Sequence, residues 1–129
     1  MSTAVIDKKL FHDVHDDNLL KTTLKQLIKA FKRMGIEVKV EKTVNTDYLH
    51  DEDFYNSICQ LNSNDNDLDN YLLYLLYTKE AHYLITDDKG IHLKAKSLGI
   101  EDKVIYLKLA YDMFAINNTV GRKFPKHYW

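Results

Sequence analysis

Residues 83–91, Tyr-Leu-Ile-Thr-Asp-Asp-Lys-Gly-Ile, say more about the architecture than any other stretch of the chain. A short apolar run ends in a threonine and two carboxylates, and a helical pattern begins straight afterwards. A buried parallel strand delivers acidic side chains to its carboxyl end in this way, and open α/β sheets place their binding sites at that end. We therefore expect Asp87 and Asp88 to lie at the carboxyl edge of a parallel sheet.

An acidic residue at the start of the preceding helix is expected to lie near the end of this strand. Asp69 begins an apolar helix, with leucines at positions 72, 73, 75 and 76, which we expect to pack beside the strand. Two or three carboxylates brought together there would repel each other unless a cation or a proton intervened. The natural cation is Mg²⁺ or Mn²⁺, because both ions favour oxygen ligands.

The rest of the chain alternates between strand and helix patterns. Further strands are predicted at 4–6, 36–40 and 103–107, and helices at about 16–34, 54–61, 90–98 and 109–116. This alternation predicts the α/β class, with a mostly parallel sheet of about four strands flanked by helices. We expect a single domain over residues 1–120, followed by a basic and aromatic tail at 121–129.

Composition limits the classes of function. The 129 residues carry a net charge of −1, so no global field draws the chain to nucleic acid or to a membrane. The single cysteine, Cys59, excludes an internal disulfide and a cysteine-based zinc site, and one free thiol fits a reducing compartment. Neither a secretory-signal pattern nor an apolar run of membrane-spanning length is found, so we expect a cytoplasmic protein without a membrane partner.

From about residue 4 to residue 116 the chain resembles the PIN domain family. The likeness lies in a "D-x-x-L-L" helix at residues 69–73, followed from residue 83 by "Y-L-I-T-x-D-K-G-I-x-x-K-A-x-x-L-G-I-x-D-x-V". The Thr-x-Asp after the strand is the hallmark of that family. PIN domains are three-layer α/β folds, and many are ribonucleases whose carboxylates hold one or two divalent ions. The resemblance therefore implies an endoribonuclease that uses Mg²⁺ or Mn²⁺ to hydrolyse RNA phosphodiesters.

The resemblance also suggests which residues would bind the metal. It places the two main acids on Asp69 and Asp88 and a third on Asp13, with Asp87 as an auxiliary ligand. Without the resemblance, Asp69 is as easily a helix cap and Asp88 a turn residue before the next helix.

One departure from the family pattern concerns the first strand. The family opens with a mid-sheet strand that carries an Asp followed by a small residue and Asn or Ser, whereas Lys8 and Lys9 follow Asp7 here. The better alignment places residues 4–6 on the second strand of the family, which leaves the first strand and its acid missing. Three explanations stay open: a strand supplied by another chain, as in a homo-oligomer; an inactive PIN-like module that binds protein or RNA; or residues 5–7 as the central strand of a trimmed sheet.

Candidate nucleic-acid contacts come from two basic groups. Lys21, Lys25 and Lys29 recur on one face of a predicted helix. One interpretation is a basic stripe that follows the phosphates of a nucleic acid, and the favoured one is the solvated face of an amphipathic helix. Arg122 and Lys123 begin the basic and aromatic tail, which would either clamp RNA or dock on another subunit.

Three tyrosines also recur at helical spacing, at positions 71, 74 and 77. Stacking on nucleic-acid bases is one interpretation, and packing against a neighbouring helix or a partner is the favoured one.

Overall fold

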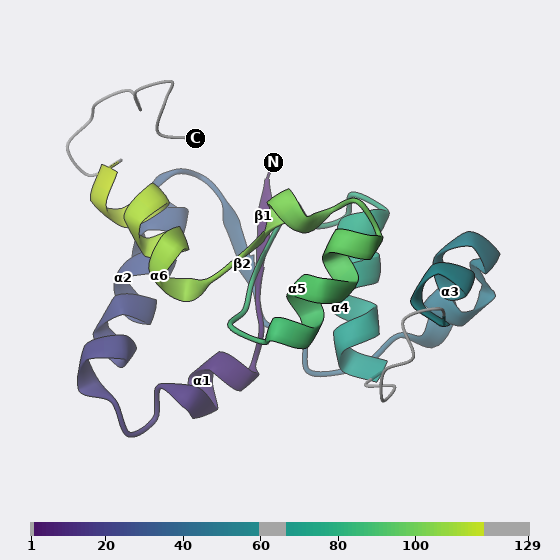
Figure 1. Cartoon of the computed structure of the whole chain (residues 1–129). Helices are drawn as coiled ribbons and strands as arrows, with labels where there is room; N and C mark the ends of the chain where they lie inside the picture. Colours follow the sequence, from purple (N-terminus) through teal and green to yellow (C-terminus); the bar gives the residue numbers. More distant parts are fainter. Residues whose placement is uncertain (1, 60–66, 118–129) are drawn as a thin grey trace.

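The computed structural model describes residues 2–59 and 67–117, which fold as an α/β domain around a parallel sheet (Figure 1). The strands are β1 (Thr3–Ile6), β2 (Glu37–Lys39), β3 (Tyr83–Ile85) and β4 (Val104–Ile105). Their order across the sheet is β2-β1-β3-β4, and every neighbouring pair is parallel. The predicted fold class, with about four mostly parallel strands flanked by helices, is confirmed.

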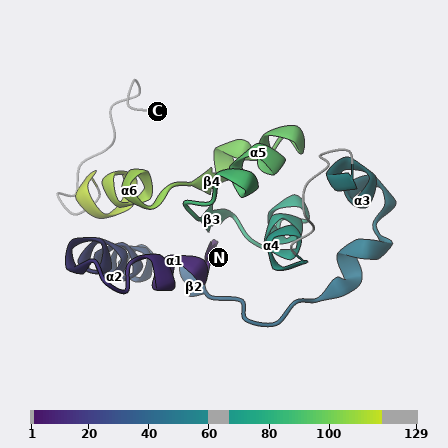
Figure 2. The same ribbon diagram turned by 60° about the horizontal axis from the view of Figure 1, so that its bottom comes forward.

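Helices cover both faces of the sheet and give three layers. The helical elements are α1 (Lys9–Asp13), α2 (Asn18–Arg33), η1 (Thr46–His50), α3 (Glu52–Cys59), α4 (Asp67–Tyr77), α5 (Lys89–Ser97), η2 (Glu101–Lys103), α6 (Leu107–Ala110) and η3 (Tyr111–Ile116). Figure 2 shows α2 and α6 on one side of the strands and α4 and α5 on the other, with α3 farther out beyond α4. Among the described residues, no helix is both long enough and apolar enough to cross a bilayer.

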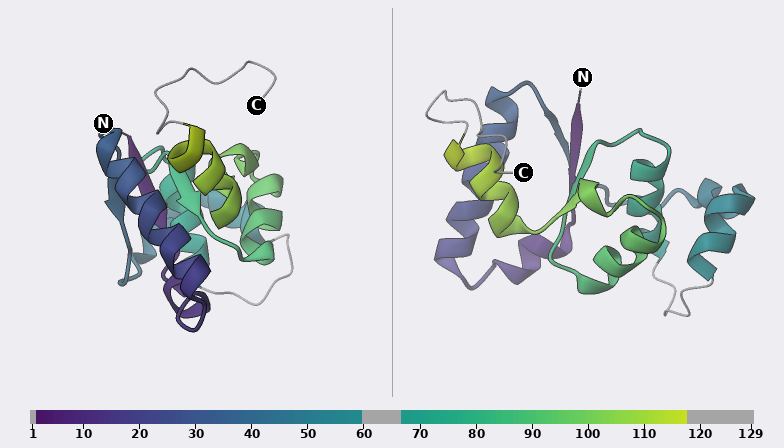
Figure 3. Two further views of the ribbon diagram at one scale, coloured as in Figure 1. Left: turned by 90° about the vertical axis from the view of Figure 1, so that its left-hand side faces the viewer. Right: turned by 45° about the horizontal axis from the view of Figure 1, so that its top comes forward.

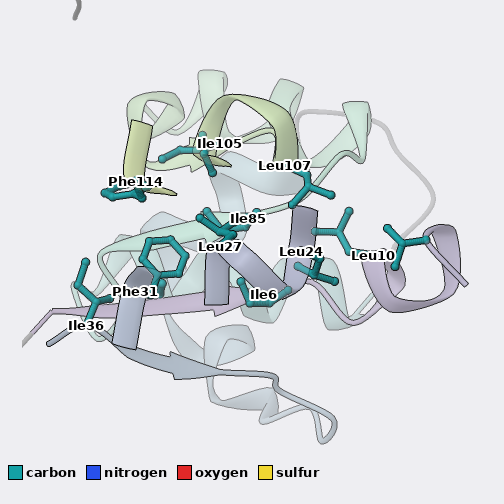
Figure 4. Close-up of a cluster of buried hydrophobic side chains, with 13 residues drawn as sticks. Ile6, Leu10, Leu24, Leu27, Phe31, Ile36, Ile85, Ile105, Leu107 and Phe114 are labelled. Carbon is teal, nitrogen blue, oxygen red and sulfur yellow. The ribbon is translucent and has the colours of Figure 1, made fainter. Parts of the chain in front are cut away.

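Alternation along the strands divides the core into two clusters. Ala4 and Ile6 belong to the cluster under α2 and α6, whereas Val5 belongs to the cluster under α4 and α5. This follows from the two-residue period of a strand, in which successive side chains point to opposite faces. Figure 4 shows the first cluster, where Phe31 of α2 and Phe114 of η3 contact each other with ring centroids 4.8 Å apart. Both faces of β1 are therefore buried, as expected inside a parallel sheet, whereas the edge strand β2 exposes Glu37 and Lys39.

Local signals fix the ends of the longest helix. The Asp17 side chain accepts a hydrogen bond from the backbone N–H of Leu20 at 3.0 Å and so caps the start of α2. Gly35 follows the end of α2 with a φ of +75°, a conformation that glycine adopts without a steric penalty. The helix predicted at about residues 16–34 thus lies at Asn18–Arg33.

Aromatic side chains form a second packing unit between η1, α3 and α4. Phe54 is fully buried, and its ring lies 4.9 Å from Tyr74, 5.2 Å from Tyr77 and 6.1 Å from Tyr48, measured between centroids. Two tyrosines of the predicted triplet thus pack against neighbouring helices, as the favoured interpretation had it.

The position of β1 bears on the open question of the first strand. Residues 4–6 had been aligned with the second strand of the PIN pattern, and in the structure β1 lies between β2 and β3 in the interior of the sheet. Asp7 therefore follows an interior strand, which is the placement that the third explanation supposes. The expectation that a partner chain completes the sheet stays a prediction.

This topology also shows where a site should form. From β1 the chain continues to β2 on one side, and β3 lies on the other side of β1. The carboxyl ends of β1 and β3 therefore flank the point at which the strand order reverses, and α/β sheets bind ligands in the crevice at such a point. In Figure 1 this edge lies at the bottom, where β1 leads into α1 and where α5 begins. Figure 3 shows the same layers from two further directions.

Candidate functional site

Three carboxylates meet at the carboxyl edge of the sheet. Asp7 directly follows β1, Asp88 follows β3 after a short turn, and Asp69 lies in the first turn of α4. Asp7 is 1% exposed and Asp69 is 8% exposed, whereas Asp88 is half-buried. Burying carboxylates is costly unless each is paired or hydrogen-bonded, so partners are expected for all three.

The shared partner is the ammonium group of Lys9, the first residue of α1. Its Nζ atom donates hydrogen bonds to Asp69 Oδ1 at 3.0 Å and to Asp88 Oδ2, and it lies 3.9 Å from Asp7 Oδ2. One positive charge thus faces three carboxylates, and the cluster retains an excess of negative charge when all three are ionised. We refer to Asp7, Asp69 and Asp88 as the carboxylate cluster.

Asp7 is fixed from two sides. The hydroxyl of Thr86 donates to Asp7 Oδ2 at 2.7 Å, and the backbone N–H of Lys9 donates to Asp7 Oδ1 at 3.0 Å. Thr86 also accepts a hydrogen bond from the backbone N–H of Asp88 at 3.1 Å. This threonine therefore connects the acid of β1 to the turn that carries the acid of β3.

Asp88 caps the start of α5. Its Oδ1 atom accepts a hydrogen bond from the backbone N–H of Ile91 at 3.2 Å, which leaves Oδ2 for Lys9. Gly90 makes room for this arrangement, because a Cβ atom there would lie 3.0 Å from Asp88 Oδ1. The motif Asp-Lys-Gly thus positions a carboxylate at the positive end of a helix and turns its second oxygen toward the cluster.

The ionisation of these groups follows from their partners. Burial raises the pKa of the Asp69 carboxyl, and the hydrogen bond and charge of Lys9 only partly oppose that effect. Burial acts in the same direction on Asp88, but hydrogen bonds from Lys9 and from the backbone of Ile91 outweigh it and lower the pKa. Burial would lower the pKa of Lys9, yet its hydrogen bonds to Asp88 and Asp69 raise that pKa above its usual value. The ammonium of Lys9 is therefore charged at neutral pH.

The cluster opens into a cavity, which we call the acidic cavity. Its volume is about 430 Å³, and it is lined by Asp7, Lys9, His12, Asp13, Thr86, Asp87 and Asp88. A volume of this size lies within the range of small-molecule sites. The Lys9 side chain is 35% exposed, so it has room to rotate away from the carboxylates.

The four acids predicted from sequence take different places. Asp69 and Asp88 contact the same ammonium group, as expected for two residues that share one site. Asp13 is exposed at the end of α1 and lines the acidic cavity, but no ion pair between Asp13 and Lys9 occurs in the described part of the chain. Asp87 lines the same cavity, yet its Oδ1 atom accepts the backbone N–H of Leu107 at 2.8 Å and so fixes the start of α6.

The donor set suits a divalent cation in kind, but Lys9 occupies the point at which the donors converge. Carboxylate oxygens are the ligands that Mg²⁺ and Mn²⁺ prefer. Within residues 2–59 and 67–117, no group of three or more acidic, histidine or cysteine side chains is arranged as a ready metal site. An ion can therefore use these carboxylates only after the Lys9 ammonium has moved away.

Sequence reasoning missed two residues at this site, Asp7 and Lys9. Asp7 carries the same signal as Asp88, an acid at the end of a short apolar strand, but Lys8 and Lys9 were read as a departure from the expected pattern. The role of Lys9 had no signal of its own, because a long flexible side chain reaches the cluster only once β1 and α4 are in place.

The remaining candidates lie elsewhere. Lys21 is half-buried, Lys25 and Lys29 are exposed on α2, and none of the three lines the acidic cavity. Arg122 and Lys123 fall outside the described residues. His92 lies near the cluster without joining it, since its Nε2 atom is 2.8 Å from the Thr86 carbonyl oxygen and its ring stacks on Tyr106.

Comparisons with models of protein families, with curated proteins and with solved structures gave no match to this chain.

Proposed function

We propose that this protein is a PIN-like endoribonuclease that depends on Mg²⁺ or Mn²⁺, with Asp7, Asp69 and Asp88 as the ligands of the ion. The observation that carries the proposal is the meeting of three carboxylates around one ammonium group at the point where the strand order reverses. Asp7 lies far from Asp69 and Asp88 in the sequence, and a single positive charge does not neutralise the three acids.

The carboxylates of this cluster are arranged to act with little rearrangement. Thr86 and the Lys9 backbone orient Asp7, and the first turn of α5 orients Asp88. Fixed ligands of this kind keep the cost of ordering a site low when a substrate arrives. A bound divalent ion would supply positive charge for the phosphodiester transition state and would acidify a water molecule.

Lys9 has a defined part in this proposal. In the protein without a divalent ion, its ammonium prevents the carboxylates from repelling one another. When the ion arrives, the ammonium leaves the cluster and remains beside it on α1, where it is available to a phosphate oxygen of the substrate. RNA as the substrate rests on the resemblance of residues 69–104 to the PIN family.

The test is cleavage of single-stranded RNA in the presence of Mn²⁺. We expect Asp7→Asn and Asp88→Asn each to abolish cleavage, because each removes a negative ligand while keeping its size. Asn is also a good helix cap, so the Asp88 variant should retain α5. Asp13→Asn is the matched control and should retain most of the activity, since Asp13 does not contact Lys9.

A second candidate function is favoured by the position of Lys9 itself. A PIN-like module that binds RNA or protein without cleaving it would be stabilised by a permanent internal cation, because the ammonium keeps the carboxylates from repelling one another. In that case neither the wild-type protein nor Lys9→Met would cleave RNA with Mn²⁺ or Mg²⁺. Cleavage that persists in Asp88→Asn would refute the proposed ligands and point to a contaminating nuclease.

A further inference from the structure

A second cavity lies next to the acidic one at the same edge of the sheet. It has a volume of about 520 Å³ and is lined by Lys8, Phe11, His12, Val40 and Lys42. We call it the basic-aromatic pocket. The proposed function does not use it.

The topology places the two cavities side by side. Lys8, Phe11 and His12 follow the carboxyl end of β1, and Val40 and Lys42 follow that of β2. The acidic cavity instead involves the ends of β1 and β3. His12 lines both cavities, so the two adjoin at this side chain.

The lining of the pocket combines positive charge with an apolar surface. Lys8 and Lys42 are exposed, and no ion pair involving either residue occurs within the described part of the chain. Phe11 is 40% exposed although it is a large aromatic side chain. Unpaired lysines beside an open aromatic ring match a ligand that carries both an anionic backbone and flat rings.

The neighbouring acidic cavity gives a further reason to expect positive charge in the pocket. A polyanion approaching three carboxylates is repelled unless positive groups beside them compensate. Lys8 and Lys42 line the pocket beside the acidic cavity and would supply this positive charge. Single-stranded nucleic acid fits better than a duplex, because bases are free to stack on a side chain only when they are unpaired.

We propose that the basic-aromatic pocket binds one nucleotide unit of a single-stranded nucleic acid, next to the phosphate that enters the acidic cavity. Phe11 stacks on the base, and Lys8 and Lys42 contact the flanking phosphates. The choice of ligand rests on the proposed function, but binding in this pocket requires no divalent ion.

The experiment measures binding without cleavage. A fluorescently labelled single-stranded RNA of ten nucleotides is titrated with the full-length protein in EDTA, and anisotropy reports the Kd at several salt concentrations. We expect Phe11→Ala to weaken binding about tenfold. Lys42→Ala should weaken binding less and should reduce the slope of log K against log salt by about 0.7, the value for one phosphate contact on a single strand.

Lys96→Ala is the matched control. It removes the same charge from an exposed position that lines neither cavity, and we expect wild-type affinity and slope. Melting temperatures of all three variants establish that each remains folded. Displacement of the RNA by polyglutamate at equal charge would mean that the pocket binds acidic peptides and would overturn the inference.

The outcomes separate this inference from the proposed function. Weaker binding by Phe11→Ala and Lys42→Ala supports the pocket even if the wild-type protein never cleaves RNA. Wild-type affinity in both variants, an effect confined to Lys96→Ala, or no RNA binding at all would overturn the pocket even if cleavage occurs.

Discussion

Replacing Lys9 by Met tests the central feature of the site, the ammonium group shared by the carboxylate cluster. Methionine keeps a long unbranched side chain and removes only the charge. At 3.0 Å, two opposite unit charges attract by about 5 kcal/mol at an effective dielectric constant of 20, whereas fully exposed pairs contribute at most about 1 kcal/mol. Because the Lys9 side chain is 35% exposed, we take about 2 kcal/mol for its interaction with the cluster.

The same free energy should appear in two measurements. Without a divalent ion, Lys9→Met should lower the free energy of unfolding by about 2 kcal/mol, which shifts the melting temperature by about 8 °C. Mn²⁺ binding to the wild-type protein has to break the contacts of Lys9, so the variant should bind Mn²⁺ roughly 30-fold more tightly. Mn²⁺ should therefore restore the stability that the substitution removes.

Urea unfolding in EDTA and calorimetric titration with Mn²⁺ measure the two quantities. The slope of the urea transition should stay unchanged, since the folded and unfolded surfaces are the same. Lys8→Met is the control, because this neighbouring lysine is exposed and the described contacts give it no ion pair. Loss of stability without tighter Mn²⁺ binding would refute the idea that the ammonium occupies a cation site, and unchanged stability would refute its role in holding the carboxylates together.

Three further predictions concern individual residues. Gly90→Ala should favour α5 by helix propensity but press on Asp88 Oδ1, so calorimetry should show Mn²⁺ binding about tenfold weaker without loss of stability; unchanged binding would contradict the close contact. The hydrogen bonds that lower the pKa of Asp88 stabilise the fold above the usual carboxyl pKa of 3.8, and this contribution is lost as pH falls through the lower folded-state value. The stability difference between the wild type and Asp88→Asn, followed by urea unfolding, should thus be constant near neutral pH and should shrink in acid. A difference that does not change with pH would show that the charge of Asp88 is not involved. Phe54→Ala should lower the free energy of unfolding by about 3–4 kcal/mol, because a fully buried ring with three aromatic neighbours leaves a cavity; a loss below about 1 kcal/mol would mean that α3 packs loosely.

The sheet and two of its acids could be predicted from sequence because their signals are local. A short apolar run followed by Thr86 and Asp88 indicates a buried strand end, and the leucines after Asp69 indicate a helix that packs on it. Asp88 follows the strand and Asp69 begins the helix that leads back into it, so both acids lie at the carboxyl edge of the sheet. The same reasoning applied to β1 would have included Asp7.

The order of the strands and the role of single side chains had no such local signal. The four buried residues of β1 do not by themselves show which strands lie beside it. The adjacent acids Asp87 and Asp88 look alike in sequence, yet one accepts the N–H of Leu107 and the other faces Lys9. Their roles separate only when α6 and α1 have taken their positions.

The hydroxyl of Thr86 has a consequence for how the protein folds. It joins Asp7 to a turn 79 residues later, so the bond closes most of the chain into one loop. Closing a long loop costs entropy before any contact repays it, and such non-local pairing is slow to form. Asp7 and Asp88 consequently come together only once β1 and β3 lie side by side. A cation that binds the three acids would stabilise the folded domain, and its affinity would show whether the whole chain has folded.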